Sequence, residues 1–128
     1  MASHYLERLA GVEGLRIPRE GTHARTNWQT FIVEVSRPFR QREVMRAMLD
    51  AGISTRRAVI CAHRELSDPH SEWSCGRDPK ECGCIPGHCE RLTQSESAQE
   101  HAIILPLYQQ MTDADQERVA AALRAAVS

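Results

Sequence analysis

The feature that most constrains the fold is a segment with period-two alternation between residues 28 and 35. Phe31, Val33 and Val35 fall on one side of this segment, whereas the even-numbered residues fall on the other. Successive side chains of a β-strand point to opposite faces of its sheet, so the pattern predicts a strand with at least one buried face. Any fold of this chain must therefore place the segment in a sheet.

Three other segments carry apolar residues at the spacing of an α-helix. They cover residues 5–10, 42–51 and 112–127. Gly52 is placed to end the second helix in a left-handed conformation, and Thr112 is placed to cap the third. Each of these helices would present one apolar face to a core.

The remaining elements are short. Extended segments are expected at 15–18, 55–61 and 103–106. A short helix is expected at 93–101, where Thr93 and Glu96 have the spacing of a capping box. Together these elements predict an α+β fold in a single domain over residues 1–128, with a small, mainly antiparallel sheet and helices packed on one face.

Residues 66–92 differ in kind from the rest of the chain. They hold four cysteines, three glycines and three prolines, with little apolar periodicity, and this composition predicts a long loop. A loop of this length in a compact domain is either functional or held by something. Its apolar side chains are too few to offset the conformational entropy lost on ordering, so an ordered loop would need a covalent or coordinative link.

The cysteines of this loop are candidate metal ligands. They are Cys75, Cys82, Cys84 and Cys89. Four thiolates could hold one tetrahedral structural zinc ion, but the spacing is not that of paired Cys-x-x-Cys knuckles, so free thiols and disulfides stay open as alternatives. Cys82 and Cys84 can converge if the chain turns sharply at Gly83; otherwise His70 or His88 would replace one sulfur.

Composition narrows the class of protein. The 128 residues carry 16 basic and 17 acidic side chains, and a formal net charge of −1 argues against a dedicated binder of nucleic acid or membrane surfaces. No apolar run is long enough to span a bilayer and no charged-then-apolar leader opens the chain, so we expect a cytoplasmic location. In that compartment cysteines are expected to be reduced or metal-bound.

Seven short blocks, taken in order, carry a resemblance to a known family. They are NWQTF at 27–31, REVM at 42–45, CAHRE at 61–65, SESAQ at 95–99, ILPLY at 104–108, MT at 111–112 and DQERV at 115–119. Their order and content are similar to those of the C-terminal small domain of the DegT/DnrJ/StrS family of pyridoxal-phosphate-dependent sugar aminotransferases. The resemblance covers most of the chain, from Tyr5 to Leu123, and implies the small domain of a fold-type-I aminotransferase without its large cofactor-binding domain.

The resemblance also implies a function that depends on other domains. In full-length relatives, pyridoxamine phosphate passes an amino group from glutamate to a keto-sugar, often a nucleotide-linked one. The expected partner is the large domain or subunit of an aminotransferase, which would bring the pyridoxal phosphate. A homo-oligomer is also expected, through the helix at 5–9 or the sheet face near Trp28.

The chain's own lysine content bears on whether it is an enzyme by itself. Its single lysine, Lys80, lies in the cysteine-rich loop, where nothing would lower the pKa of an amine for Schiff-base formation. We therefore expect a fragment or truncated product that does not catalyse transamination alone.

Five residues are candidates for lining the substrate cleft under this resemblance: His63, Asn27, Trp28, Arg56 and Arg57. His63 matches a strand-end histidine that faces the cleft in the family, although a histidine there is also commonly structural. Asn27 and Trp28 match another cleft position, and Trp28 could equally be a core residue. Arg56 and Arg57 could bind a carboxylate or phosphate, but only one of them can face a given side of a strand.

A second interpretation is a non-catalytic protein-interaction module, with or without a structural zinc ion, that docks on an aminotransferase subunit or another protein. A reading frame that continued upstream into a lysine-bearing domain would favour the first interpretation over this one. A zinc-dependent nucleic-acid binder is disfavoured by the near-neutral charge and the single lysine.

Overall fold

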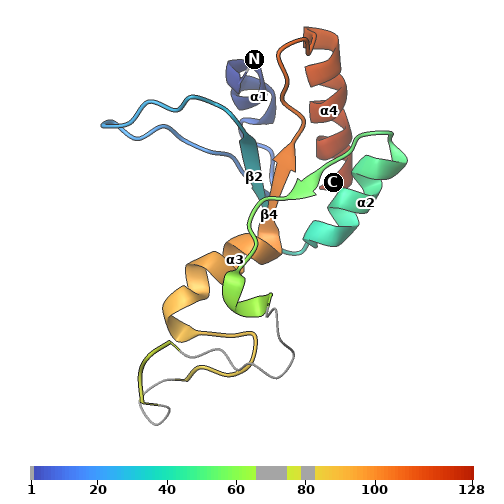
Figure 1. Ribbon diagram of the computed structural model, residues 1–128. Helices are drawn as coiled ribbons and strands as arrows, with labels where there is room; N and C mark the ends of the chain where they lie inside the picture. Colours follow the sequence, from blue (N-terminus) through green and yellow to red (C-terminus); the bar gives the residue numbers. More distant parts are fainter. Residues whose placement is uncertain (1, 66–74, 79–82) are drawn as a thin grey trace.

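The computed structural model describes residues 2–65, 75–78 and 83–128. A four-stranded sheet lies at its centre, and every neighbouring pair of strands is antiparallel. In spatial order the strands are β1 (Leu15–Arg16), β2 (Phe31–Val35), β4 (Ala102–Leu105) and β3 (Arg56–Arg57) (Figure 1). The strand expected from the period-two alternation is β2, which pairs on both sides.

The register between β2 and β4 creates the face on which the core is built. Phe31 pairs with Leu105 and Val33 pairs with Ile103, and all four side chains are buried. The alternate residues of β2 are only half-buried. The burial pattern therefore follows the alternation seen in the sequence, because a strand places successive side chains on opposite faces.

Three helices pack on the buried face. They are α1 (Ala2–Leu9), α2 (Gln41–Asp50) and α4 (Asp113–Ala126), and α4 contacts both of the others. Tyr5 of α1 lies against Phe31 with ring centroids 5.0 Å apart, and its hydroxyl donates to the carbonyl of Pro106 at 2.8 Å. The predicted α+β architecture, with an antiparallel sheet and helices on one face, is confirmed.

A fourth helix, α3 (Thr93–His101), lies at one end of the sheet with the 3-10 turns η1 (Ala62–Arg64) and η2 (Glu90–Leu92). α3 leads directly into β4, and in Figure 1 the described residues 75–78 and 83–89 lie at its far end, away from the sheet. Within the described part of the chain, no helix is long and apolar enough to cross a membrane.

The strand expected at 55–61 is much shorter in the structure. β3 holds only Arg56 and Arg57, and Ile60, which lies within the expected segment, is 67% exposed. The reason lies in the partner strand. Arg57 pairs with Ile103, and the N–H of Ala58 donates to the carbonyl of Ala102, the first residue of β4. Beyond this point the chain has a helix beside it instead of a strand, so the backbone hydrogen bonds of a sheet cannot continue.

The two helix caps expected from the sequence, the Thr112 cap of α4 and the Thr93–Glu96 capping box of α3, have different outcomes. At α4 the box is present: Thr112 Oγ1 accepts from the N–H of Asp115 at 3.1 Å, and Asp115 Oδ2 accepts from the N–H of Thr112 at 2.9 Å. At α3 it is absent, because the helix is preceded by Leu92 and no side chain caps it. The Glu96 carboxylate is instead engaged with partners distant from the cap position.

The starts of α4 and α3 provide a matched pair of variants. Thr112→Ala removes the acceptor at the start of α4 and should lower the free energy of unfolding by about 1 kcal/mol, the usual cost of losing an N-cap side chain. Thr93→Ala, at the exposed first residue of α3, where no side chain caps the helix, should leave it nearly unchanged. Urea denaturation followed by circular dichroism measures both, and equal losses in the two variants would contradict this assignment.

Candidate functional site

An arginine-rich hollow lies where the start of α2, the end of α3 and strand β3 meet. Its volume is about 830 Å³. Its basic lining residues are Arg37, Arg40, Arg42, Arg57, Arg64 and His101. The only acidic residues among the described lining are Glu43 and Glu100. Because arginines outnumber carboxylates and guanidinium groups match carboxylate and phosphate geometry, the hollow suits an anion.

A buried glutamine that lines this hollow joins α2 to the segments beside it. Gln41 is 6% exposed, and its Nε2 donates to the carbonyls of Gln99 and Ala102 at 3.0 and 2.6 Å. These bonds join the first residue of α2 to the junction of α3 and β4. The Oε1 atom of Gln99, which also lines the hollow, is buried without a hydrogen-bond partner in the described structure. An unsatisfied buried polar atom is uncommon in folded proteins.

A buried carboxylate links α3 to the segments around it. Glu96 is 5% exposed. Its Oε1 lies 2.8 Å from Nε2 of His63 and accepts from the N–H of Cys89 at 2.6 Å. Its Oε2 lies 2.6 Å from Nδ1 of His88 and 3.3 Å from the guanidinium of Arg64. One side chain of α3 therefore holds η1 and the turn before α3 together.

The protonation of this group follows from its contacts. Burial raises the pKa of the Glu96 carboxyl, but hydrogen bonds from His88, from the N–H of Cys89 and from His63 outweigh it and lower the pKa to about 2. Glu96 is thus ionised at neutral pH and can only accept hydrogen bonds. It follows that the facing nitrogens of both imidazoles carry protons and donate to it.

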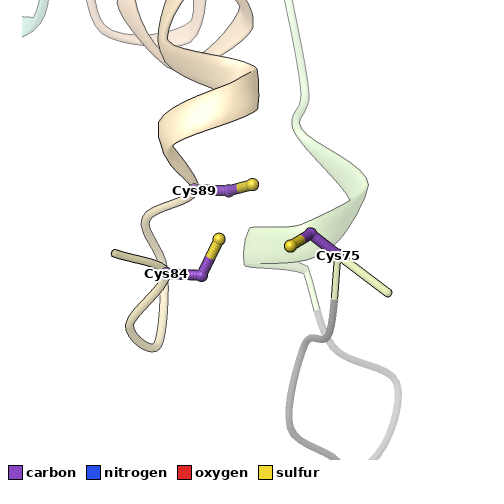
Figure 2. A group of neighbouring side chains, drawn as sticks. All are labelled: Cys75, Cys84 and Cys89. Carbon is purple, nitrogen blue, oxygen red and sulfur yellow. The ribbon is translucent and has the colours of Figure 1, made fainter. Parts of the chain in front are cut away.

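Three cysteine side chains converge beside this network. Figure 2 shows the sulfur atoms of Cys75, Cys84 and Cys89 turned toward one another, and all three lie within 4.8 Å of each other. Cys89 is fully buried and the other two are half-buried. Of the four metal ligands predicted from the sequence, the structure brings these three together. Cys82 lies outside the described residues and stays a prediction, as do the alternative ligand His70 and the lone lysine, Lys80.

His88, the other alternative ligand, is not in the cysteine cluster. Its Nδ1 is bonded to Glu96, and it is absent from the group of potential ligand atoms found among the described residues. Cys61, the last residue of the extended segment expected at 55–61, is 4% exposed. It precedes η1 and lies outside the regular strand in which it was expected.

The candidate cleft residues do not all lie in one place. Arg57 lines the arginine-rich hollow, whereas Arg56 lines a different hollow beside Tyr108, as expected for neighbours on a strand. His63 is 3% exposed and held by Glu96 near α3. Asn27 and Trp28 precede Phe31, which pairs with the far end of β4 from α3. The structure therefore does not bring these two to His63, and their shared cleft stays a prediction.

The local roles of two of these residues are visible. Trp28 has a left-handed backbone, with a φ of 52°, and its ring stacks on Phe31 with centroids 5.6 Å apart. Asn27 Oδ1 accepts from the N–H of Gln29 at 3.2 Å. Trp28 thus packs against the core, which is the alternative that the sequence left open for it.

Sequence reasoning missed the central residue of this region, Glu96. A feature of α3 could have revealed it. The helix reads TQSESAQEH and has no apolar stripe, and the residues that it buries are Glu96 and Gln99, three positions apart. A helix that docks through a polar face must satisfy its buried groups with specific partners, so this sequence predicts hydrogen-bond donors on segments distant from α3.

Comparison with known proteins agrees with this geometry. The model of the DegT/DnrJ/EryC1/StrS aminotransferase family matches residues 1–124. The chain belongs to this family. No curated protein sequence matches it.

Three solved structures show what the family fold covers. The aminotransferase TlmJ from Streptoalloteichus hindustanus is 25% identical with a TM-score of 0.69, and the match covers 98% of this chain and 29% of that one. DesI, solved with its TDP-sugar product, is 24% identical with a TM-score of 0.71, covering 96% and 28%. A family aminotransferase from Brucella abortus is 20% identical with a TM-score of 0.68, covering 97% and 28%. This DegT/DnrJ/EryC1/StrS chain thus spans less than a third of these proteins.

The buried carboxylate can be tested against an exposed neighbour on the same helix. Glu96→Ala should destabilise this family domain markedly, because it leaves two imidazoles and the N–H of Cys89 without their acceptor. Glu100→Ala removes only an exposed ion pair with Arg64, worth about 0–1 kcal/mol. Thermal unfolding should separate the two variants clearly, and similar midpoints would show that Glu96 is not the link between α3 and its neighbours.

Proposed function

We propose that the chain is the C-terminal small domain of a pyridoxal-phosphate-dependent sugar aminotransferase and that it works with a large domain or subunit that carries the cofactor. The family match over residues 1–124 supports this most directly. The sugar aminotransferases that share its fold are more than three times longer, which leaves room in them for a cofactor domain.

The described residues do not fit the cofactor itself. Pyridoxal phosphate enzymes of this kind hold the aldehyde on a lysine, and the described part of the chain contains no lysine. The domain would instead contribute to the substrate side of the cleft. Its role is to bind and orient the substrate, while the partner supplies the chemistry of amino transfer.

The arginine-rich hollow is the part of the domain best suited to that role. A nucleotide-linked sugar carries a diphosphate, and arginine side chains bind phosphate oxygens in bidentate fashion. Arg40 and Arg57 make no ion pair within the described structure, so their charges are available to a ligand. DesI, with a similar fold, was solved with a TDP-sugar. We therefore assign the hollow to the diphosphate of a nucleotide-sugar substrate.

A titration with thymidine diphosphate tests this assignment on the chain itself. Half a binding site should bind weakly, with a dissociation constant of about 1 mM, and the side-chain signals of Arg57, Gln99 and His101 should shift in NMR spectra. Arg57→Ala should weaken binding several-fold. Arg56→Ala, on the same strand but lining another hollow, should not. Equal effects of the two variants, or no shifts at about 10 mM ligand, would remove the hollow from the proposal.

A second measurement tests whether the chain can hold pyridoxal phosphate and transfer an amino group by itself. Mixed with pyridoxal phosphate, the purified chain should give no stable internal-aldimine absorbance and no glutamate-dependent amino transfer, because its lone lysine lies in the cysteine-rich loop. Borohydride reduction followed by mass spectrometry gives the readout. A stoichiometric adduct that disappears in Lys80→Ala would show that the chain carries the cofactor by itself.

A further inference from the structure

The three converging cysteines are placed by a tight turn in the backbone. Ile85 and His88 exchange two backbone hydrogen bonds of 3.0 and 2.9 Å and form an isolated antiparallel bridge. Pro86 and Gly87 connect them, and Gly87 has a φ of +78°, which suits a glycine at the third position of a type II turn. Cys84 and Cys89 flank this bridge directly, so they are opposite each other on neighbouring strands.

This arrangement brings the two sulfurs to the same side of the hairpin, because directly opposed residues of an antiparallel pair share a face. Cys75 reaches the same point from a separate stretch of chain, as Figure 2 shows. Three soft donor atoms from two segments thus meet within 4.8 Å. In a tetrahedral zinc site with Zn–S bonds of about 2.3 Å, sulfur atoms are about 3.8 Å apart, so small side-chain rotations would close the cluster around an ion.

The segment that carries the cysteines has few buried apolar side chains, so metal coordination would explain how it is held in place. Cys89 is the only buried apolar residue between 75 and 92 in the described structure, and Ile85 is 63% exposed. Burial of one cysteine cannot offset the entropy lost by ordering this segment. Coordination can, because a metal that binds the thiolates of the folded chain, and not the unfolded chain, adds its binding free energy to the free energy of folding.

We propose that Cys75, Cys84 and Cys89 bind one structural zinc ion, with one coordination position left for a further donor. Zinc is favoured among metals because soft thiolate ligands in a small tetrahedral cluster select it. The ion holds the described residues 75–78 and 83–89 against the start of α3. It would do so whether or not the domain serves an aminotransferase, since no residue of the arginine-rich hollow belongs to the cluster.

The zinc site also determines the position of His63. The N–H of Cys89 donates to Glu96 Oε1, and the same oxygen is 2.8 Å from His63 Nε2. A metal that fixes Cys89 therefore fixes the carboxylate to which His63 is bonded. Ligand orientation by backbone and carboxylate contacts of this type is common around structural metals. Loss of the ion should then disturb His63, although His63 is not a ligand.

Metal analysis of the chain, produced in zinc-supplemented medium and purified without chelator, tests the site. We expect about one zinc and almost no iron per chain. Cys84→Ser should reduce zinc to less than about a tenth of an equivalent. Cys61→Ser is the matched control, since Cys61 is a buried cysteine outside the cluster, and it should retain the ion.

A second readout is independent of whether a variant folds. Removing zinc from the wild-type chain with a chelator should shift the imidazole signals of His63 and His88 and expose residues 75–89 to limited proteolysis. The signals of His4, on α1, should stay in place. Restoring zinc should reverse these changes.

Three results would overturn the proposal. The first is wild-type protein that holds less than about a tenth of a zinc under these conditions. The second is zinc that stays bound in Cys84→Ser at the wild-type amount. The third is mass spectrometry showing Cys84 and Cys89 joined by a disulfide in protein kept under reducing conditions, which would leave too few thiolates to hold the ion.

Discussion

The pairing of β2 with β4 is the constraint on which the rest of the domain depends. It joins residues about seventy positions apart in the chain and places Phe31, Val33, Ile103 and Leu105 on one surface. Without that surface, none of the three covering helices would have an apolar partner large enough to bury its own stripe. β4 also limits the length of β3, its other neighbour, because β4 begins only where α3 ends. One register thus positions the core, the short edge strand and the arginine-rich hollow beside it.

The parts of the fold that sequence predicted well are those governed by local periodicity. Phe31, Val33 and Val35 alternate, and the helices at 42–51 and 112–127 repeat with helical spacing, so side-chain polarity alone located them. The capping role of Thr112 was equally local. The extent of β3 was not predictable in this way, since Val59 and Ile60 have the composition of a strand but none of the described strands pairs with them. Strand length depends on a neighbour that periodicity cannot reveal.

In the candidate site, too, one part was predictable from the sequence and another was not. Convergence of Cys75, Cys84 and Cys89 was predictable, because soft ligands crowded into one glycine- and proline-rich segment suggest a common ion. The role of Glu96 was missed, because its spacing from Thr93 suggested a capping box. The absence of an apolar stripe in α3 points to a polar docking face, but the partners of Glu96 come from η1 and from the turn before α3, so only the tertiary structure identifies them.

Arg64 belongs to two parts of the molecule at once. It lines the arginine-rich hollow, and its Nε donates at 2.7 Å to the carbonyl of Gly87, inside the turn that carries two of the three clustered cysteines. An anion that drew this guanidinium toward the hollow would compete with the turn for the same side chain. If this competition changed how the turn places its cysteines, binding at the two sites would be coupled, and such coupling is reciprocal. Whatever factor an occupied hollow imposed on metal affinity, the bound metal would impose on the affinity for the anion.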